Sequence, residues 1–385
     1  MKFFHLSDLH IGLKLMNRDL QEDQVFILKK IAALAEYEQP DAVVIAGDIY
    51  DKPIPSAEAV GVFDSFLQEL TSALPEAEIL LISGNHDSAG RLDCYRSILA
   101  RQHVHMIGQP PHAPEDQIEK VALRDRFGAV NFYLLPFVKP SMVKEITGTR
   151  EDGTNFSYNE AVHALIEREQ IDENQRNVIV SHQFYLPKGT TAEDVERADS
   201  EIRTVGNIDE VCADILERFE YAALGHIHKP MKVGRGTIRY CGTPLACSVS
   251  EAGQKKGILV VELGEKGTAP QIRELPLEPM RSVRIERGEL DELLRHPSED
   301  YVSIVLTDRE DLDVIDMQER LHEAFPNLLE IRRENLRRAD YRKPLSAAQI
   351  PDSFELCRGF LGDLDEKSLE LLRDVVNVAK EVTLA

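Results

Sequence analysis

Seven side chains of this sequence have the chemistry to bind divalent metal ions together: two carboxylates, one amide and four imidazoles. Each follows a short strand-like run of the chain, and together they are Asp8, His10, Asp48, Asn85, His182, His226 and His228. Oxygen and imidazole ligands suit Mn²⁺, with Fe²⁺, Co²⁺ or Zn²⁺ as alternatives. Two such ions about 3.5–4 Å apart activate water and neutralise charge on a phosphate ester. The residue types therefore indicate metal-dependent phosphoester hydrolysis.

The spacing of these residues supports a shared site. Asp8 and His10 are two residues apart, and the same spacing returns in the motif GHIH. On an extended segment, residues two apart project to one side. Asp48 stands in GDIYD, where it could bridge two ions, and Asn85 stands in GNHD. Each motif alone is also ordinary turn or surface chemistry, but their ordered occurrence at predicted strand ends favours one metal centre.

Predicted strands and helices alternate in the first 110 residues, as expected for βαβ units with parallel strands. Helical patterns near 19–37 and 56–72 separate the first strands. Ligands of α/β sheets collect at the carboxyl ends of strands. The runs that end in the metal motifs are 2–7, 41–46, 77–82, 177–182 and 221–228.

The remaining sequence divides the chain into three expected parts. Apolar runs at 238–244 and 257–263 are predicted to form a second sheet facing the first. From about residue 275 the pattern changes to strand and helix units typical of a small α+β domain. A linker at 342–351 then precedes two amphipathic helices, the second with Asp365 as N-cap. The predicted parts are 1–274, 275–341 and 342–385.

Composition restricts the possible partners and the compartment. The 385 residues are 43% hydrophobic, and no run approaches the roughly 18 to 20 apolar residues of a membrane span. Five cysteines without a C-x-x-C pair are expected to be reduced thiols, so we expect a cytoplasmic protein. The net charge of −22 repels DNA overall. Binding to nucleic acid would need metals, clustered basic residues or a partner subunit.

The ordered motifs D-x-H, G-D-x-x-D, G-N-H-D, H and G-H-x-H resemble the calcineurin-like metallophosphoesterases over the first 230 residues. SHQFYLP, ADSEIRTVG, FEYAALGHIHKP and YCGTPLACSVSEAGQKKG are similar to one branch, the D subunits of bacterial SbcCD nucleases. A looser similarity covers the rest of the chain. The resemblance implies an α/β fold, a four-layer sandwich of two mixed sheets flanked by helices. After the sandwich we would expect two further parts. The first is a small α+β domain that caps DNA, and the second is a pair of C-terminal helices.

The resemblance also implies a role for each site residue. One metal would be held by Asp8, His10, Asp48 and His228, and the other by Asp48, Asn85, His182 and His226. A metal-activated water would be the nucleophile. His86 would stabilise or protonate the leaving oxygen, and Asp87 would orient its ring. Whether Asp51 in GDIYD takes part is left open.

By the same resemblance, the chain would be the nuclease subunit of an ATP-dependent complex. It would act as a 3′-to-5′ double-strand exonuclease and a single-strand and hairpin endonuclease in DNA repair, recombination and replication. The terminal helices would bind an SbcC-type coiled-coil ATPase, and helices near 56–72 and 90–100 would form a homodimer. Basic residues close to the motifs are candidate phosphate contacts: Lys14, Arg18, Lys52, Arg91 and Lys229.

Several alternatives stay open from the sequence. The same metal site could serve a small-molecule phosphodiesterase or a protein phosphatase, although neither usually needs the extra domain and helices. The chain could instead be a non-catalytic scaffold for an ATPase, which the complete ligand set and His86 disfavour. Finally, the terminal helices could pack on the small domain, and the basic residues could be solvated surface charge.

Overall fold

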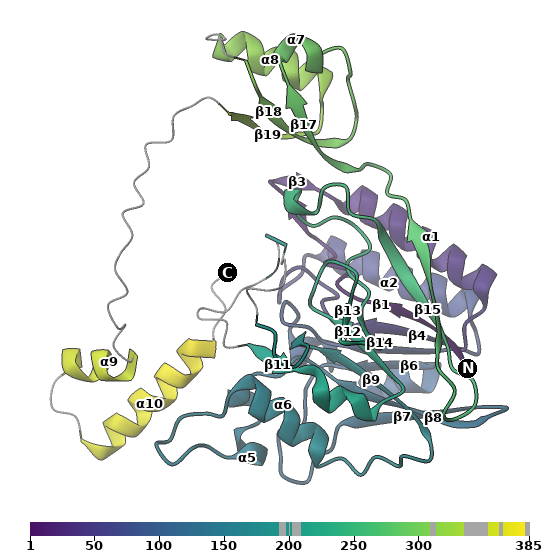
Figure 1. Ribbon diagram of the computed structural model, residues 1–385, viewed down its shortest axis with the longest axis vertical. Coiled ribbons are helices and arrows are strands. Elements are labelled where there is room, and N and C mark those ends of the chain that lie inside the picture. The colour runs from purple at the N-terminus through teal and green to yellow at the C-terminus, as the bar shows by residue number, and fades with distance from the viewer. Residues whose placement is uncertain are drawn as a thin grey trace.

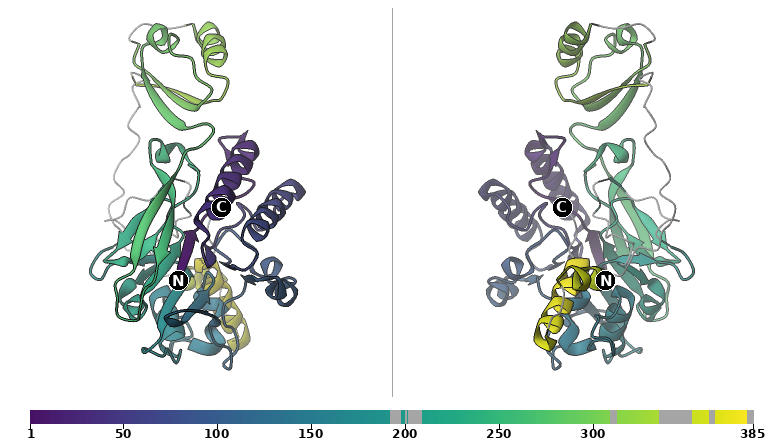
Figure 2. Two further views of the ribbon diagram at one scale, coloured as in Figure 1. Left: turned by 90° about the vertical axis from the view of Figure 1, so that its right-hand side faces the viewer. Right: turned by 90° about the vertical axis from the view of Figure 1, so that its left-hand side faces the viewer.

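Two six-stranded sheets pack face to face in the computed structural model, and helices cover their outer faces (Figures 1 and 2). The structure describes residues 1–191, 198–199, 201, 209–308, 313–334, 353–361 and 365–381. The core between the sheets is apolar, and Phe3, Val44, Phe132 and Val178 are all fully buried there. Burying such a side chain contributes about 1.5–3 kcal/mol. The predicted four-layer α/β sandwich is confirmed.

The first sheet has four neighbouring parallel strands, of which the first three along the chain lead to metal motifs, and two further strands that pair in antiparallel fashion at one side. Its order is β16 (Gln271–Leu277), β15 (Lys256–Glu262), β1 (Lys2–Leu6), β4 (Ala42–Ala46), β5 (Glu78–Ile82) and β6 (Val104–Ile107). The prediction that segment 257–263 belongs to the second sheet is wrong, because β15 pairs with β1. An apolar run shows that a strand is buried but not which strand it pairs with.

The second sheet faces the first and contains the later ligand strands. Its order is β13 (Met231–Val233), β14 (Arg235–Tyr240), β12 (Tyr221–Gly225), β9 (Arg176–His182), β8 (Gly128–Leu135) and β7 (Glu119–Asp125). Strands β8, β9, β12 and β14 run parallel to one another. The parallel strands of both sheets therefore end at a common edge.

Helices cover both outer faces of the sandwich. The first sheet is covered by α1 (Gln21–Glu38) and α2 (Ala57–Ala73), whose first turn is capped by the Ser56 side chain. The second sheet is covered by α6 (Tyr158–Glu167), which begins with a capping box, and η4 (Ala213–Arg218). The helix expected near 90–100 is replaced by short turns, α3 (Ala89–Leu92), α4 (Arg96–Leu99) and η1 (Ala100–Gln102).

The remaining short elements lie mostly in the loops around the sheets. They are β2 (Lys14–Leu15), β3 (Arg18–Asp19), η2 (Pro140–Met142), α5 (Lys144–Thr147), β10 (Phe184–Leu186), β11 (Glu210–Cys212) and η5 (Val249–Glu251). Much of the segment 198–206, which contributed to the family resemblance, lies outside the described residues.

The small domain is a parallel three-stranded sheet with two helices, at the top of Figure 1. Its elements are β17 (Val283–Gly288), α7 (Leu290–Leu293), β18 (Tyr301–Leu306), α8 (Val314–Ala324) and β19 (Leu328–Arg333). Strand β16 continues to Leu277, so the first sheet extends slightly past the expected boundary at 274. The predicted linker at 342–351 lies outside the described residues.

Of the two C-terminal helices, α10 (Glu366–Glu381) contacts the sandwich, and α9 (Ser353–Leu361) packs on α10. Asn377 donates to the carbonyl of Gly153 at 3.2 Å, and Lys144 lies 4.0 Å from Asp374. Asp365 accepts from the Ser368 amide and is the N-cap of α10, as expected. Figure 1 shows these helices away from the small domain. The alternative that the terminal helices pack on the small domain is therefore wrong. Among the described residues, no helix is long and apolar enough to cross a membrane.

Candidate metal centre

The loops that follow β1, β4, β5, β9 and β12 converge at the carboxyl edge of the two sheets. The Asp8 amide donates to the Gly47 carbonyl at 2.9 Å, and the His10 amide donates to the Asp48 carbonyl at 3.1 Å. Close approach explains the glycines of the motifs: a Cβ at Gly84 would clash with the Asp48 carboxylate, and one at Gly225 would clash with a carbonyl of β4.

Several candidate ligands adopt the left-handed backbone conformation, which L-residues rarely occupy. Asp8, His10, Asp48 and His226 have φ angles of 54°, 44°, 52° and 102°. Left-handed non-glycine residues cluster at functional sites, where the surrounding structure imposes them. The tight turns aim consecutive polar side chains toward one point.

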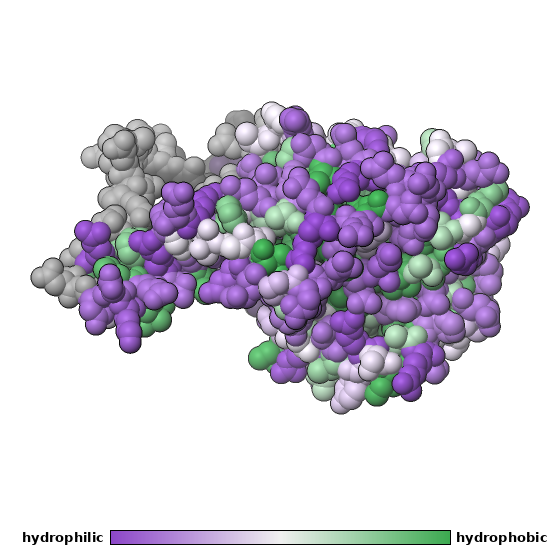
Figure 3. Space-filling view, turned by 90° about the horizontal axis from the view of Figure 1, so that it is seen from below, coloured by the Kyte–Doolittle hydropathy of each residue, from purple (hydrophilic) through white to green (hydrophobic). Residues whose placement is uncertain are grey.

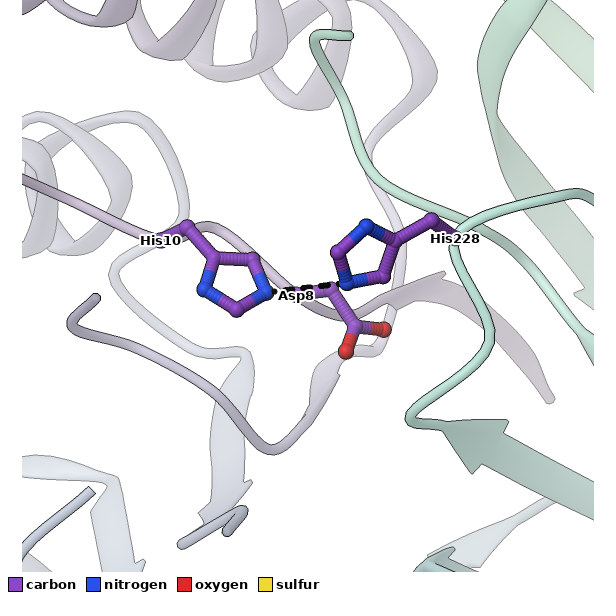
Figure 4. Close-up of side chains that lie close together, drawn as sticks. All are labelled: Asp8, His10 and His228. Atoms are coloured by element: carbon purple, nitrogen blue, oxygen red, sulfur yellow. Dashed lines mark hydrogen bonds between the residues drawn. The ribbon is translucent and has the colours of Figure 1, made fainter. Parts of the chain in front are cut away.

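Asp8, His10 and His228 form the first half of the centre, and each is at most 2% exposed. The Nε2 atoms of His10 and His228 face each other at 3.1 Å (Figure 4). His228 Nδ1 lies 3.3 Å from the Glu251 carboxylate, so this nitrogen carries the proton and Nε2 presents a lone pair. A cation beside the facing nitrogens satisfies this arrangement.

Asn85, His182 and His226 form the second half. The Asn85 Oδ1 atom lies 3.0 Å from His182 Nε2 and 2.9 Å from His226 Nδ1. His182 donates through Nδ1 to the Ala46 carbonyl at 2.7 Å, so Nε2 is the nitrogen that faces the amide oxygen. Burial alone would lower the pKa of His182, yet Asp48 raises it to about 9, so a proton occupies Nε2 in the metal-free protein. Two facing acceptors repel each other unless a proton or a metal lies between them. This donor set also fits a divalent cation.

Asp48 lies between the two halves. Its Oδ2 atom is 3.2 Å from His182 Nε2 and 3.8 Å from His10 Nε2. Burial alone would raise the pKa of Asp48, yet neighbouring imidazoles, His182 first among them, hold it well below its usual range. Burial raises the pKa of Asp8 to about 6. Among the described residues, no lysine or arginine forms an ion pair with either carboxylate, so the positive charge they need must come from imidazolium or metal.

His86 and Asp87 occupy the same loop but have different partners from those expected. His86 Nδ1 donates to the Asp51 carbonyl at 2.9 Å, which leaves Nε2 available toward the site. The Asp87 carboxylate accepts from the amides of Ile49, Tyr50 and Gly84 at 2.9–3.0 Å. The prediction that Asp87 orients the ring of His86 is therefore corrected. Asp87 ties the loops after β4 and β5 together, and the carbonyl of Asp51 orients the ring.

Asp51, whose role the sequence leaves open, lies beside His10, on the side of the ring nitrogen that does not face His228. Its carboxylate lies 3.8 Å from His10 Nδ1, and burial raises its pKa. The side chains of Lys14 and Lys52, both exposed, line a cavity of about 350 Å³ together with Asp51. Two of the candidate phosphate contacts thus lie beside the metal centre.

The other three basic candidates have different surroundings. Arg18 donates to the Leu328 carbonyl at 3.3 Å, so it joins the sandwich to the small domain. Arg91 and Lys229 are exposed. For Arg18, a role in holding the two domains together is at least as well supported as a phosphate contact.

Sequence reasoning missed two buried side chains that hold ligand loops, Gln24 and Glu251. Gln24 donates to the His10 carbonyl at 2.6 Å, and Glu251 is 1% exposed behind His228. Glu251 stands in the run LACSVSEAG, where a single acidic residue among small and apolar ones was the available signal. Gln24 carries no such signal, because its helical position is equally consistent with a surface residue.

The family model of calcineurin-like phosphoesterases matches residues 1–230, so the chain belongs to this family of phosphoester hydrolases. Residues 276–356 match the model of the type 5 capsule protein repressor C-terminal domain. The chain is 29% identical over 337 residues to the D subunit of the nuclease SbcCD from Staphylococcus epidermidis, covering 86% of this chain and 84% of that relative. The expected resemblance is confirmed.

Solved structures give more distant similarities, each at 12% identity. The protein TT1561 of Thermus thermophilus has a TM-score of 0.41 over 72% of this chain and 99% of its own. The inner membrane complex anchor GAP50 of Plasmodium has a TM-score of 0.41 over 86% of this chain and 96% of its own. A dimetal phosphatase from Danio rerio has a TM-score of 0.37 over 72% and 99%.

Proposed function

We propose that this protein is the metal-dependent DNA nuclease subunit of an SbcCD-type complex. The observation that carries the proposal is the convergence of seven candidate ligand side chains on one edge of a phosphoesterase sandwich. The similarity to an SbcCD nuclease subunit extends over most of the chain, including the small domain. The substrates would be double-strand ends and hairpins, cut by 3′-to-5′ exonuclease and endonuclease activities in repair, recombination and replication.

Each half of the centre would hold one divalent ion, preferably Mn²⁺. Asp8, His10 and His228 would bind one ion, Asn85, His182 and His226 the other, and Asp48 would bridge them. When bound, the ions supply an activated water and neutralise charge on the phosphate. The buried loops hold the ligands before the ions arrive, since the described contacts connect their backbones to one another.

His86 is the proposed general acid. Its Nδ1 proton is directed to the Asp51 carbonyl, so only Nε2 can face the substrate. A protonated Nε2 would donate to the leaving oxygen as the ester bond breaks, and a neutral ring could not. Asp87 keeps this loop against the loop after β4. Lys14 and Lys52, beside Asp51, would contact the substrate's neighbouring phosphates.

Two exposed apolar surfaces support the proposed partners. On α9 and α10, Phe360 is 92% and Leu371 65% exposed, as expected for helices that bind a coiled-coil ATPase, which would couple cleavage to ATP. Near α2 and α4, Ile54, Tyr95 and Ile98 are 61–75% exposed, which fits a homodimer through these segments. From below, the molecule is largely hydrophilic with separate small hydrophobic groups (Figure 3).

Cleavage of end-labelled duplex and hairpin DNA tests the proposal. The purified chain is assayed with and without Mn²⁺, alone and with the partner ATPase, beside Asn85→Ala, His86→Ala and a chromogenic phosphodiester. We expect metal-dependent DNA cleavage that both substitutions reduce by about 10²–10⁴-fold. His86→Ala should still bind metal.

Two outcomes would reject the proposal. Hydrolysis of the small ester with DNA intact, even with the ATPase, would identify a small-molecule phosphodiesterase of the same family. Partner binding without hydrolysis of either substrate would identify a non-catalytic scaffold.

A further inference from the structure

Glu251 is a buried carboxylate that lies behind the ring of His228, opposite the nitrogen that faces His10. It ends η5, in the loop between β14 and β15, and is 1% exposed. A buried carboxylate is costly unless several donors surround it. Its partners therefore indicate what the loop is built to hold.

The partners of Glu251 hold His228 from two directions. The Oε1 atom lies 3.3 Å from His228 Nδ1 and accepts from the Cys247 amide at 3.2 Å and the Ser248 hydroxyl at 3.1 Å. Lys256 donates to Oε2 at 2.6 Å and also to the His228 carbonyl at 3.0 Å. The ring and the backbone of His228 are thus fixed by one ion pair.

Gln24 holds His10, the other imidazole in the first half of the centre. The side chain is 4% exposed, donates to the His10 carbonyl at 2.6 Å and accepts from the Gly12 amide at 3.0 Å. These two bonds hold the turn after β1, in which His10 has a left-handed backbone. Helix α1 therefore fixes the direction in which His10 points.

The second half is held differently. His182 donates through Nδ1 to the Ala46 carbonyl at 2.7 Å, a backbone group of β4. His226 and Asn85 contact each other at 2.9 Å. The sheet itself orients His182, whereas side chains from a loop and a helix orient His10 and His228. This asymmetry allows the two ion sites to be separated by mutation.

We propose that Glu251 and Gln24 are positioning residues for the ion held by His10 and His228, an inference that rests on the metal centre of the proposed function. A carboxylate that accepts from Nδ1 fixes the tautomer with its lone pair on Nε2 and makes that nitrogen a stronger ligand. Removal of such a partner usually costs about 10–100-fold in metal affinity.

A third metal site behind His228 would be the competing interpretation. His228, Cys247 and Glu251 do place possible ligand atoms near one another. Lys256, however, donates to the same carboxylate at 2.6 Å and would repel a second cation there. The loop is therefore a support for His228.

The small domain braces both positioning residues. Ala252, next to Glu251, packs against the cluster that contains Val283 and Tyr301. Asp23, next to Gln24, accepts from Arg281 at 2.7 Å and from the Tyr301 hydroxyl at 2.8 Å. The first half of the centre is thus the half that the small domain supports.

Binding of Mn²⁺ to the metal-free full chain, followed by calorimetry and electron paramagnetic resonance, tests the inference without an activity assay. We expect two ions on the wild type. Glu251→Gln should weaken one by about 10–100-fold and leave the other within about twofold. Gln24→Ala should weaken the same ion. Glu169→Gln is the matched control, because Glu169 is also buried and accepts a backbone amide far from the ligands.

The double variant Glu251→Gln with Lys256→Met guards against misfolding, because it removes both buried charges together. It should weaken the same ion. If Glu251→Gln and the double variant both bind two ions with wild-type affinity, the positioning role of Glu251 is overturned. The metal centre and the proposed function are not affected by that outcome. Equal weakening of both ions, or similar weakening in Glu169→Gln, would also overturn the positioning role. A wild type that binds no Mn²⁺ would overturn the metal centre, and the proposed function with it.

Discussion

The two edges of the sandwich treat buried charge in opposite ways. At the carboxyl edge, where β1, β4, β5, β9 and β12 end, Asp8 and Asp48 are buried without an ion-paired lysine or arginine among the described residues. At the amino edge, where β1 and β9 begin, Asp125 pairs with buried Arg176 at 3.0 Å and with the amino group of Met1. A guanidinium and an amino group thus neutralise the carboxylate at the amino edge, whereas the charged groups that face Asp8 and Asp48 are imidazoles that are themselves candidate ligands.

The largest effect is expected at the carboxyl edge. Asp48→Asn removes the carboxylate shared by both halves, so we expect hydrolysis to fall by at least about 10³-fold. The free energy of unfolding of the metal-free protein should also fall, because the lowered pKa of Asp48 means that its imidazole neighbours stabilise this carboxylate in the folded state. Phosphodiester hydrolysis and urea unfolding measure the two quantities. Activity within tenfold of wild type would contradict the proposed bridging role.

The carboxyl edge is also the part that the sequence predicts best. Asp8, Asn85 and His182 stand at the ends of apolar runs, within three residues of the last apolar side chain, so strand prediction alone places them at strand ends. The supports of the site are less predictable. Glu251 meets His228 only because a loop folds back from β14, and β15 pairs with β1 across most of the chain. Such long-range contacts leave no local periodic pattern.

Asp125→Asn tests the amino edge. Arg176 would be left buried without its carboxylate, so we expect a loss of about 3 kcal/mol in unfolding free energy with hydrolysis unchanged. The hydrogen bonds from Arg176 hold the pKa of Asp125 well below its usual 3.8. The stabilisation is therefore present above about pH 4 and is lost as the pH falls further through the folded-state pKa. Urea unfolding at pH 7 and pH 3 should show a smaller difference between variant and wild type at pH 3.

His5 lies inside β1, between the two edges, and also makes stability depend on pH. Here the folded protein holds the group neutral, whereas it holds Asp125 charged. Its Nε2 donates to the Leu224 carbonyl at 3.1 Å, and its Nδ1 accepts from the Tyr221 hydroxyl at 2.9 Å. Burial, with a smaller contribution from Arg239, lowers the pKa of His5 from 6.5 to about 3. Only the unfolded chain binds the proton between these values, so stability falls by about 1.4 kcal/mol per pH unit below 6.5.

His5→Gln should reduce the slope of the unfolding free energy against pH by about 1.4 kcal/mol per pH unit in this range, because one fewer proton is taken up on unfolding. Urea unfolding between pH 7 and pH 5 measures the slope for each protein. An unchanged slope in the variant would show that His5 is not the group responsible.

The smallest effect is expected for the exposed ion pair at the amino edge. Lys266 pairs with Glu220 and has a side chain that is 36% exposed. Lys266→Ala should cost less than about 1 kcal/mol, because solvent screens such pairs. A loss as large as that of Asp125→Asn would mean that burial does not distinguish the two pairs. Urea unfolding of both variants in one buffer makes the comparison.

The left-handed turns at Asp8, His10, Asp48 and His226 have a consequence for metal exchange. Each such residue costs about 1–3 kcal/mol, and the surrounding contacts offset that cost when the chain folds. The backbone of the ligand turns is therefore already in its final conformation when an ion binds. Replacement of one divalent ion by another needs no reordering of the backbone, so the rate of exchange should not depend on refolding of these turns.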